Sequence, residues 1–129
     1  ASVRVVTGDT EADLAAEGDR QRRQFAFLYS TPAYRRGLDV VGLGHLQEQL
    51  AAMVREDRWT DLGDVVTDQV LGALVPTARY ADLADVVRDR VGDLVDTVAL
   101  ALPENPAHDR QMAAVAARLR EASPGGPPA

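Results

Sequence analysis

Apolar residues recur at helical spacing through most of this chain, and breaks rich in glycine, proline and threonine separate the periodic stretches. This spacing predicts helices over residues 10–29, 33–41, 45–57, 60–75, 79–94 and 105–121. Two segments follow another pattern. A β-branched run predicts a short strand over Val3–Thr7, and a nearly continuous apolar run predicts a second strand over Thr97–Leu102, of the kind that is covered on both faces.

The order of these elements indicates the fold class. Two strands joined by a long helical stretch predict a right-handed parallel crossover, because antiparallel strands are more often joined by a short hairpin. Two strands do not make a stable sheet alone. We therefore expect an α/β fold of which this chain is the last part, with residues 1–122 in the domain and residues 123–129, which are rich in proline and glycine, in a flexible tail.

The most distinctive stretch is the corner that follows the first helix. Four of the six aromatic residues of the chain lie between Phe25 and Tyr34. The helix is expected to end near Ser30, because the residue before a proline is pushed out of the α-helical region. Thr31 then caps the next helix, and Pro32 takes its first position, where a missing N–H costs nothing.

Four stretches together carry a resemblance to a known family. They are the strand at 3–7, the helix start Gly8-Asp9-Thr10-Glu11, the corner motif Ser30-Thr31-Pro32-Ala33-Tyr34 and the closing segment at 92–98. On these residues the chain resembles the C-terminal part of the luciferase-like oxidoreductases, in the branch that uses the deazaflavin coenzyme F420. The resemblance implies an eight-stranded parallel (β/α) barrel, or TIM barrel, in which the two strands here are the seventh and the eighth. Strands one to six would lie outside this chain.

The resemblance also implies a function. It predicts an oxidoreductase that transfers hydride between coenzyme F420 and a small organic substrate, or an FMN-dependent monooxygenase of the same superfamily. Tyr34, with Ser30 and Thr31 nearby, is the expected cofactor-binding group, because an aromatic ring with a hydroxyl contacts a flat flavin-like ring and also forms hydrogen bonds. In the other interpretation, Tyr34 packs the helix corner and Thr31 only caps the helix.

No catalytic acid or base is predicted from these residues. A rival hypothesis from another class is a non-catalytic helical interaction module that has no cofactor site. The protein partner in these hypotheses is a second copy of the chain or the remaining strands of the barrel. Arg35 and Arg36 suit a coenzyme phosphate, but an ion pair with Asp39 one turn further along the helix is the simpler interpretation.

Composition narrows the classes of chemistry. The chain has no cysteine and its 14 basic residues are all arginine, so thiol nucleophiles and Schiff-base lysines are excluded.

A net charge of −6, with arginines interleaved among aspartates, argues against nucleic-acid binding, and the charged residues leave no apolar run long enough to cross a membrane. Neither His45 nor His108 has neighbours at metal-ligand spacing, so no metal site is predicted. We expect a cytoplasmic protein, because no signal-peptide pattern opens the sequence.

Overall fold

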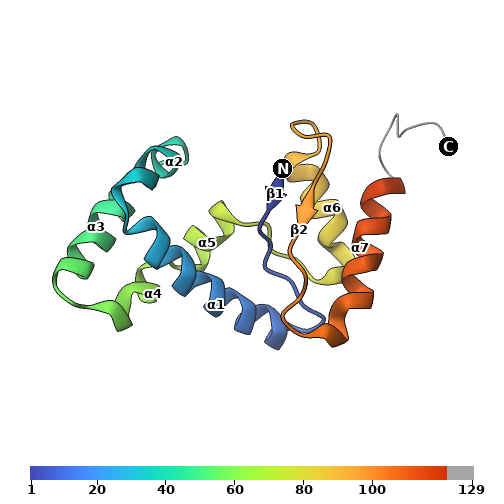
Figure 1. Cartoon of the computed structure of the whole chain (residues 1–129), viewed down its shortest axis with the longest axis horizontal. Coiled ribbons are helices and arrows are strands. Elements are labelled where there is room, and N and C mark those ends of the chain that lie inside the picture. Colours follow the sequence, from blue (N-terminus) through green and yellow to red (C-terminus); the bar gives the residue numbers. More distant parts are fainter. Residues whose placement is uncertain (122–129) are drawn as a thin grey trace. The chain divides into compact units, whose positions relative to one another are not determined.

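The computed structural model describes residues 1–121 of the 129-residue chain. The predicted tail, residues 123–129, lies outside the described residues. The chain divides into two compact units: the first contains residues 1–15 and the residues from Val75 onward, and the second contains residues 16–74. The described part is mostly helical and includes two short parallel strands, which is an α/β arrangement at a coarse level (Figure 1).

The two strands lie in the first unit and run parallel, as predicted. Strand β1 (Ser2–Val3) pairs with β2 (Ala99–Leu100), with Ser2 opposite Ala99 and Val3 opposite Leu100. Both strands are shorter than the predicted 3–7 and 97–102, and β1 begins one residue earlier. A parallel β-bridge between Val6 and Thr77 accounts for part of the difference. Val6 N donates to the oxygen of Pro76 over 2.9 Å, and Ala78 N donates to the oxygen of Val6 over 3.0 Å.

Two helices cover one face of the strand pair (Figure 1). They are α6 (Tyr80–Val91) and α7 (Asp109–Glu121). Their apolar positions and the strands share one core, whose buried members are Val5, Tyr80, Leu83, Ala84, Val87, Met112 and Val115. Val3 and Leu100 pack against this core, whereas Ser2 and Ala99, one residue away in each strand, are exposed. Within residues 1–121 the second strand is therefore covered on one face.

An arginine joins the two covering helices of the first unit. Arg118 on α7 donates to the carboxylate of Asp85 on α6 over 3.0 Å, and it also donates to the backbone oxygen of Ala81. Arg88 on α6 donates in turn to the oxygen of Arg118 over 3.2 Å. These contacts lie at the exposed edge of the helix pair, so the apolar core supplies most of the stabilisation and the ion pair adds little.

The second unit is helical throughout. Helix α1 (Glu11–Tyr29) begins in the first unit and continues into the second. The elements that follow are the 3₁₀ turn η1 (Pro32–Tyr34), α2 (Arg35–Val40), α3 (Gly44–Arg55), the 3₁₀ turn η2 (Trp59–Asp61), α4 (Leu62–Val65) and α5 (Asp68–Leu74). Buried side chains of this unit include Phe25, Leu38, Leu46, Leu50, Met53, Leu62 and Val66. No helix within residues 1–121 is long and apolar enough to cross a membrane.

The single helix predicted over 60–75 is wrong. Thr60, expected to cap it, lies inside η2, and the helix is broken between α4 and α5 at Val66, which has φ −85° and ψ 86°. Thr67 caps α5 instead: its Oγ1 accepts from Val70 N over 3.3 Å, and its backbone oxygen accepts from Leu71 N over 2.9 Å. Val66 is β-branched, and such a residue loses side-chain freedom in a helix. At the break, outside the helix, the side chain of Val66 is fully buried.

The start of α1 follows the capping-box pattern. Thr10 precedes the first helical residue; its Oγ1 accepts from Asp13 N over 3.1 Å, and Thr10 N donates to the Asp13 carboxylate over 3.1 Å. Asp9 N donates to the same carboxylate over 3.2 Å. The corner at the other end of α1 is different. Thr31 has the extended backbone of a cap residue and Pro32 follows it, as predicted, but the Thr31 side chain makes no capping hydrogen bond.

These two threonines make a matched pair for a stability measurement. Thr10→Ala removes a capping hydrogen bond and is expected to lower the free energy of unfolding by about 1 kcal/mol. Thr31→Ala removes a side chain without such a bond and is expected to change stability by less than about 0.5 kcal/mol. Urea unfolding followed by far-UV circular dichroism measures both. Equal losses in the two variants would contradict the assigned capping box.

Candidate functional site

The predicted cofactor-binding residues lie together at the corner after α1. Ser30 Oγ donates to the backbone oxygen of Phe27 over 2.7 Å, and Tyr34 N donates to the oxygen of Thr31 over 3.2 Å. Gln47 on α3, which is buried, donates to the oxygen of Ser30 over 3.1 Å and holds the corner against the next helix. The side chain of Tyr34 is 43% exposed. The structure therefore brings the three predicted residues into one corner of the second unit.

A row of aromatic rings supports this corner. Phe25 and Tyr29, one helical turn apart, are stacked with their centroids 5.4 Å apart and their planes within 7°. Tyr34 then meets Tyr29 edge to face, with a centroid separation of 5.9 Å and an angle of 88°. Such edge-to-face pairs add about 0.5–1.5 kcal/mol beyond area burial. Tyr34 thus has the packing role of the simpler interpretation and is still partly exposed.

The arginine beside this corner is already paired. Arg35 lies 3.9 Å from the carboxylate of Asp39, as predicted, and donates to Glu48 on α3. The hydrogen bond to Glu48 raises the pKa of the Arg35 guanidinium. A phosphate at this position would compete with two carboxylates, so the corner is suited to contact with a neutral aromatic ring more than with an anion.

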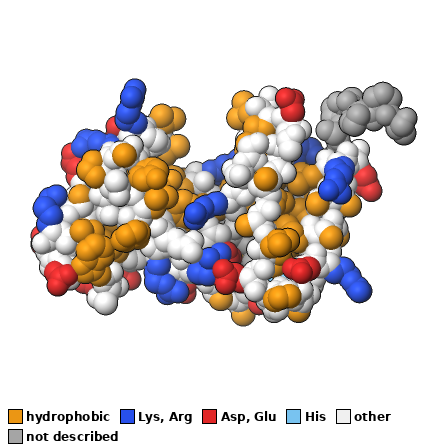
Figure 2. Space-filling model, in the orientation of Figure 1, with side chains coloured by type: hydrophobic (Ala, Val, Ile, Leu, Met, Phe, Trp, Pro, Cys, Tyr) orange, Lys and Arg blue, Asp and Glu red, His pale blue; other side chains and the backbone are white. Residues whose placement is uncertain are grey.

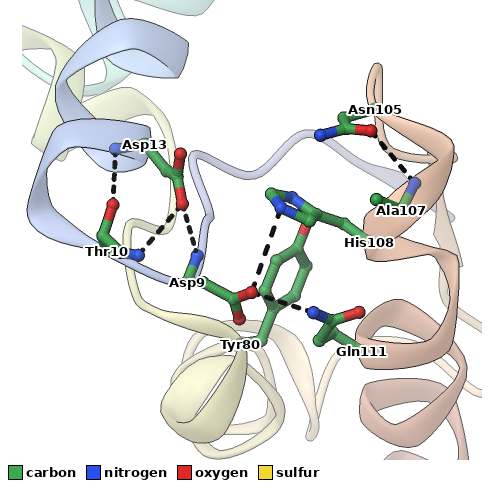
Figure 3. Close-up of polar contacts among 8 residues, drawn as sticks. All are labelled: Asp9, Thr10, Asp13, Tyr80, Asn105, Ala107, His108 and Gln111. Carbon is green, nitrogen blue, oxygen red and sulfur yellow. Dashed lines mark hydrogen bonds and ion pairs between the residues drawn. The ribbon is translucent and has the colours of Figure 1, made fainter.

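A second group of polar residues gathers in the first unit, beyond the C-terminal end of β1 (Figure 3). It comprises Asp9 from the loop before α1, Tyr80 from the start of α6, His108 from the 3₁₀ turn η3 (Pro106–His108) and Gln111 from α7. In the sequence, Asp9 belongs to a predicted helix start and His108 has no neighbours at metal-ligand spacing, and no site role was predicted for Tyr80 or Gln111. Their proximity could not be predicted because Asp9 and Gln111 are 102 positions apart.

The imidazole of His108 lies between a tyrosine and an aspartate. The Tyr80 hydroxyl is 3.4 Å from Nδ1, and the two rings meet edge to face with centroids 5.5 Å apart. On the other side of the imidazole, Nε2 is 3.9 Å from Oδ2 of Asp9, and this carboxylate accepts from Gln111 Nε2 over 2.8 Å. Tyr80 is 8% exposed, so the imidazole has a buried anchor on one side and a polar partner on the other.

Two further polar features belong to the loop that carries Asp9. The carboxylate of Asp13 accepts from the backbone N–H groups of Asp9 and Thr10, which fixes the loop onto the start of α1 (Figure 3). The hydroxyl oxygen of Thr7 is buried and has no hydrogen-bond partner among residues 1–121. No group of three or more His, Cys, Asp or Glu residues in the same range is arranged to hold a metal ion.

Comparison with known proteins gives few matches. No known protein family and no solved structure matches the chain. Over 70 residues, the chain is 40% identical to uncharacterized proteins of Mycobacterium tuberculosis (strains H37Rv and CDC 1551) and of Mycobacterium bovis. The match covers 54% of this chain and 21% of each relative, so the chain spans about a fifth of the length of the curated relatives it matches.

The Asp13 carboxylate predicts a pH dependence of stability. Hydrogen bonding to the Thr10 side chain is the main cause that lowers the pKa of Asp13, and the backbone N–H groups of Thr10 and Asp9 and the nearby His108 lower it further. Because its pKa is lower in the folded state than in the unfolded chain, the Asp13 contribution is present above about pH 4 and is lost as pH falls through the folded pKa.

Chemical denaturation between pH 2.5 and 7 measures this contribution. Asp13→Asn is expected to be less stable than the wild type at neutral pH and to approach it at the acid end. Asp93→Asn, at an exposed turn after α6, is the control and is expected to follow the wild-type profile. If Asp13→Asn ran parallel to the wild type over the whole range, Asp13 would not be the group that responds.

Proposed function

We propose that this chain is the C-terminal part of a luciferase-like (β/α)₈ barrel, an oxidoreductase that transfers hydride between coenzyme F420 and a small organic substrate. The observation that best supports the proposal is the parallel pair β1–β2, which is joined by a long helical excursion and covered by helices on one face. In a barrel of this type, helices cover the outer face of each strand and the inner face meets side chains of the other strands.

The uncovered face of the strand pair fits this arrangement. Ala99 in β2 and Ser2 opposite it in β1 are exposed. The second face of a parallel pair is normally covered by protein, because parallel sheets are buried on both sides. The remaining strands of a barrel would supply this cover.

The length of the relatives is also compatible with a complete barrel. If 70 residues are 21% of a mycobacterial relative, that protein has roughly 330 residues. Such barrels typically need about 250 residues and range from about 200 to more than 400. The relatives are therefore long enough to hold six further strand–helix units besides the matched region.

Tyr34, Ser30 and Thr31 are the residues we assign to coenzyme contact. The partly exposed Tyr34 ring, held edge-on by Tyr29, suits contact with the flat ring system of a deazaflavin. The neighbouring Arg35 is engaged by Glu48, so the coenzyme phosphate would be bound elsewhere in the barrel. When bound, the coenzyme supplies the hydride chemistry, and the protein supplies orientation and hydrogen bonds.

One surface feature favours the rival hypothesis of a non-catalytic interaction module. Phe27 and Trp59 form an exposed aromatic pair in the second unit, with centroids 6.1 Å apart and exposed fractions of 62% and 47%. Trp59 Nε1 donates to Asp57 over 2.7 Å, which holds the ring in place. Hydrophobic side chains are visible on the surface of both units (Figure 2). Ordered aromatic residues of this kind are enriched at protein–protein interfaces.

Binding measurements distinguish these functions. We expect the Mycobacterium tuberculosis relative to quench the fluorescence of F420 with a dissociation constant in the micromolar range or below. The 129-residue chain is expected to bind it far more weakly, because most of the pocket would lie in strands that the chain does not contain. Titration with FMN under the same conditions is the control for cofactor choice.

Three outcomes would change the proposal. Preference of the relative for FMN would favour the monooxygenase. Failure of the relative to bind either cofactor would favour the interaction module. Tight binding of F420 by the 129-residue chain would contradict the assignment of most of the pocket to the other strands.

A further inference from the structure

The hydrogen bond between Tyr80 and His108 indicates which imidazole nitrogen carries the proton. If the Tyr80 hydroxyl donates to Nδ1, the neutral imidazole carries its hydrogen on Nε2. The opposite tautomer would direct the lone pair of Nε2 toward the carboxylate of Asp9, which is electrostatically unfavourable. The arrangement therefore favours a His108 that presents an N–H donor toward Asp9.

Within residues 1–121 that donor has no acceptor at hydrogen-bond distance. The 3.9 Å between Nε2 of His108 and Oδ2 of Asp9 is too long for a hydrogen bond, and no other residue in this range forms a hydrogen bond with Nε2. The side chains of His108 and Asp9 are 21% and 43% exposed, so solvent reaches both residues. A group that approaches from solvent can contact both atoms, because an oxygen about 2.8 Å from each lies beside the line that joins them.

We propose that Asp9 and His108 bind a neutral group that both accepts and donates a hydrogen bond, namely a hydroxyl or a carboxamide. The oxygen of such a group accepts from Nε2–H, and its own hydrogen is donated to the Asp9 carboxylate. A carboxylate or phosphate ligand would be repelled by Asp9. A group that only accepts, such as a ketone, would form the hydrogen bond from Nε2–H but not the one to Asp9.

The surroundings of these two residues favour a ligand site over an incidental contact. Gln111 orients the Asp9 carboxylate from one side, and the buried Tyr80 orients the imidazole from the other. The backbone of Asp9 is fixed by its N–H bond to Asp13. In sheets of parallel strands, ligands bind beyond the carboxyl ends of the strands, where Asp9 follows β1.

This inference goes beyond the proposed function, because it needs neither the coenzyme nor further strands. All of the residues belong to the first unit of the 129-residue chain. A negative result with F420 would leave it unaffected, and a negative result here would leave the proposed oxidoreductase unaffected.

Nuclear magnetic resonance of the histidine side chains tests the proposal on the full chain. Long-range ¹H–¹⁵N spectra report the tautomer of each imidazole, and His108 is expected to be the Nε2–H form when its imidazole is neutral. His45, the second of the two histidines, is exposed on α3 in the other unit and serves as an internal control. Tyr80→Phe is expected to shift the His108 tautomer ratio and to leave the His45 signals unchanged.

Three small probes of similar size then distinguish the ligand chemistry. Propan-2-ol and acetamide both donate and accept, whereas acetone only accepts. Titration with either of the first two is expected to shift the His108 resonances along a saturating curve, while His45 changes only linearly with solvent composition. Acetone is expected to give no saturating change. The tighter of the two binding probes identifies a hydroxyl or a carboxamide as the preferred ligand group.

Variants at Asp9 complete the test. Asp9→Ala is expected to weaken probe binding about tenfold, which corresponds to one hydrogen bond to a charged group. Asp109→Ala, which removes an exposed aspartate at the start of α7, is the matched control and is expected to bind as the wild type does. Asp9→Asn keeps the shape of the side chain, and its affinity for the probes is measured in place of that of Asp9→Ala if the alanine variant unfolds. The proposal is overturned if His108 and His45 respond alike, if acetone binds as well as propan-2-ol, or if both Asp9 variants retain wild-type affinity.

Discussion

The parallel pairing of β1 with β2 is the constraint on which the first unit depends. It brings Val3 and Leu100, 97 positions apart in the chain, into register, and it creates the apolar surface on which α6 and α7 pack. Ordering so long a loop costs conformational entropy, and the cost rises slowly with loop length. Burial of Leu83, Val87 and Val115 against the strands is the main term that offsets it, because each fully buried aliphatic side chain contributes about 1.5–3 kcal/mol.

Local signals in the sequence predict most of the helices, since a helix start depends on residues within one turn. Asn105 and Pro106 illustrate this: Asn105 Oδ1 accepts from Ala107 N over 3.0 Å, as the cap-then-proline pattern predicts. The lengths of the strands are a different matter. Whether Val6 extends β1 or pairs with Thr77 depends on a residue 71 positions away, and no local pattern carries that information. The same limit explains why the contact between Asp9 and His108 was not predicted.

The two candidate sites differ in how they are built, and this difference explains why one of them could be predicted. The corner with Ser30, Thr31 and Tyr34 is formed by consecutive residues, so a motif in the sequence is sufficient to locate it. The group around His108 is assembled from four separate segments of the first unit, namely the loop before α1, the start of α6, η3 and α7. Its members are ordinary helix-start and core residues in the sequence, and only their convergence gives them a chemical role. Convergent sites of this kind are found from coordinates and not from periodicity.

The start of α1 couples the fold to the chemistry proposed for the first unit. Asp13 accepts from the N–H groups of both Thr10 and Asp9, so a residue in the first turn of the helix also fixes the backbone of the residue that carries the proposed ligand-binding carboxylate. Gly8 makes this approach possible, because a Cβ at that position would lie only 2.4 Å from Cβ of Asp13. A side chain at residue 8 would therefore displace the loop and the helix start together. The close contact between Gly8 and Asp13 is a steric requirement for the position of Asp9, and the hydrogen bonds within the cluster depend on that position.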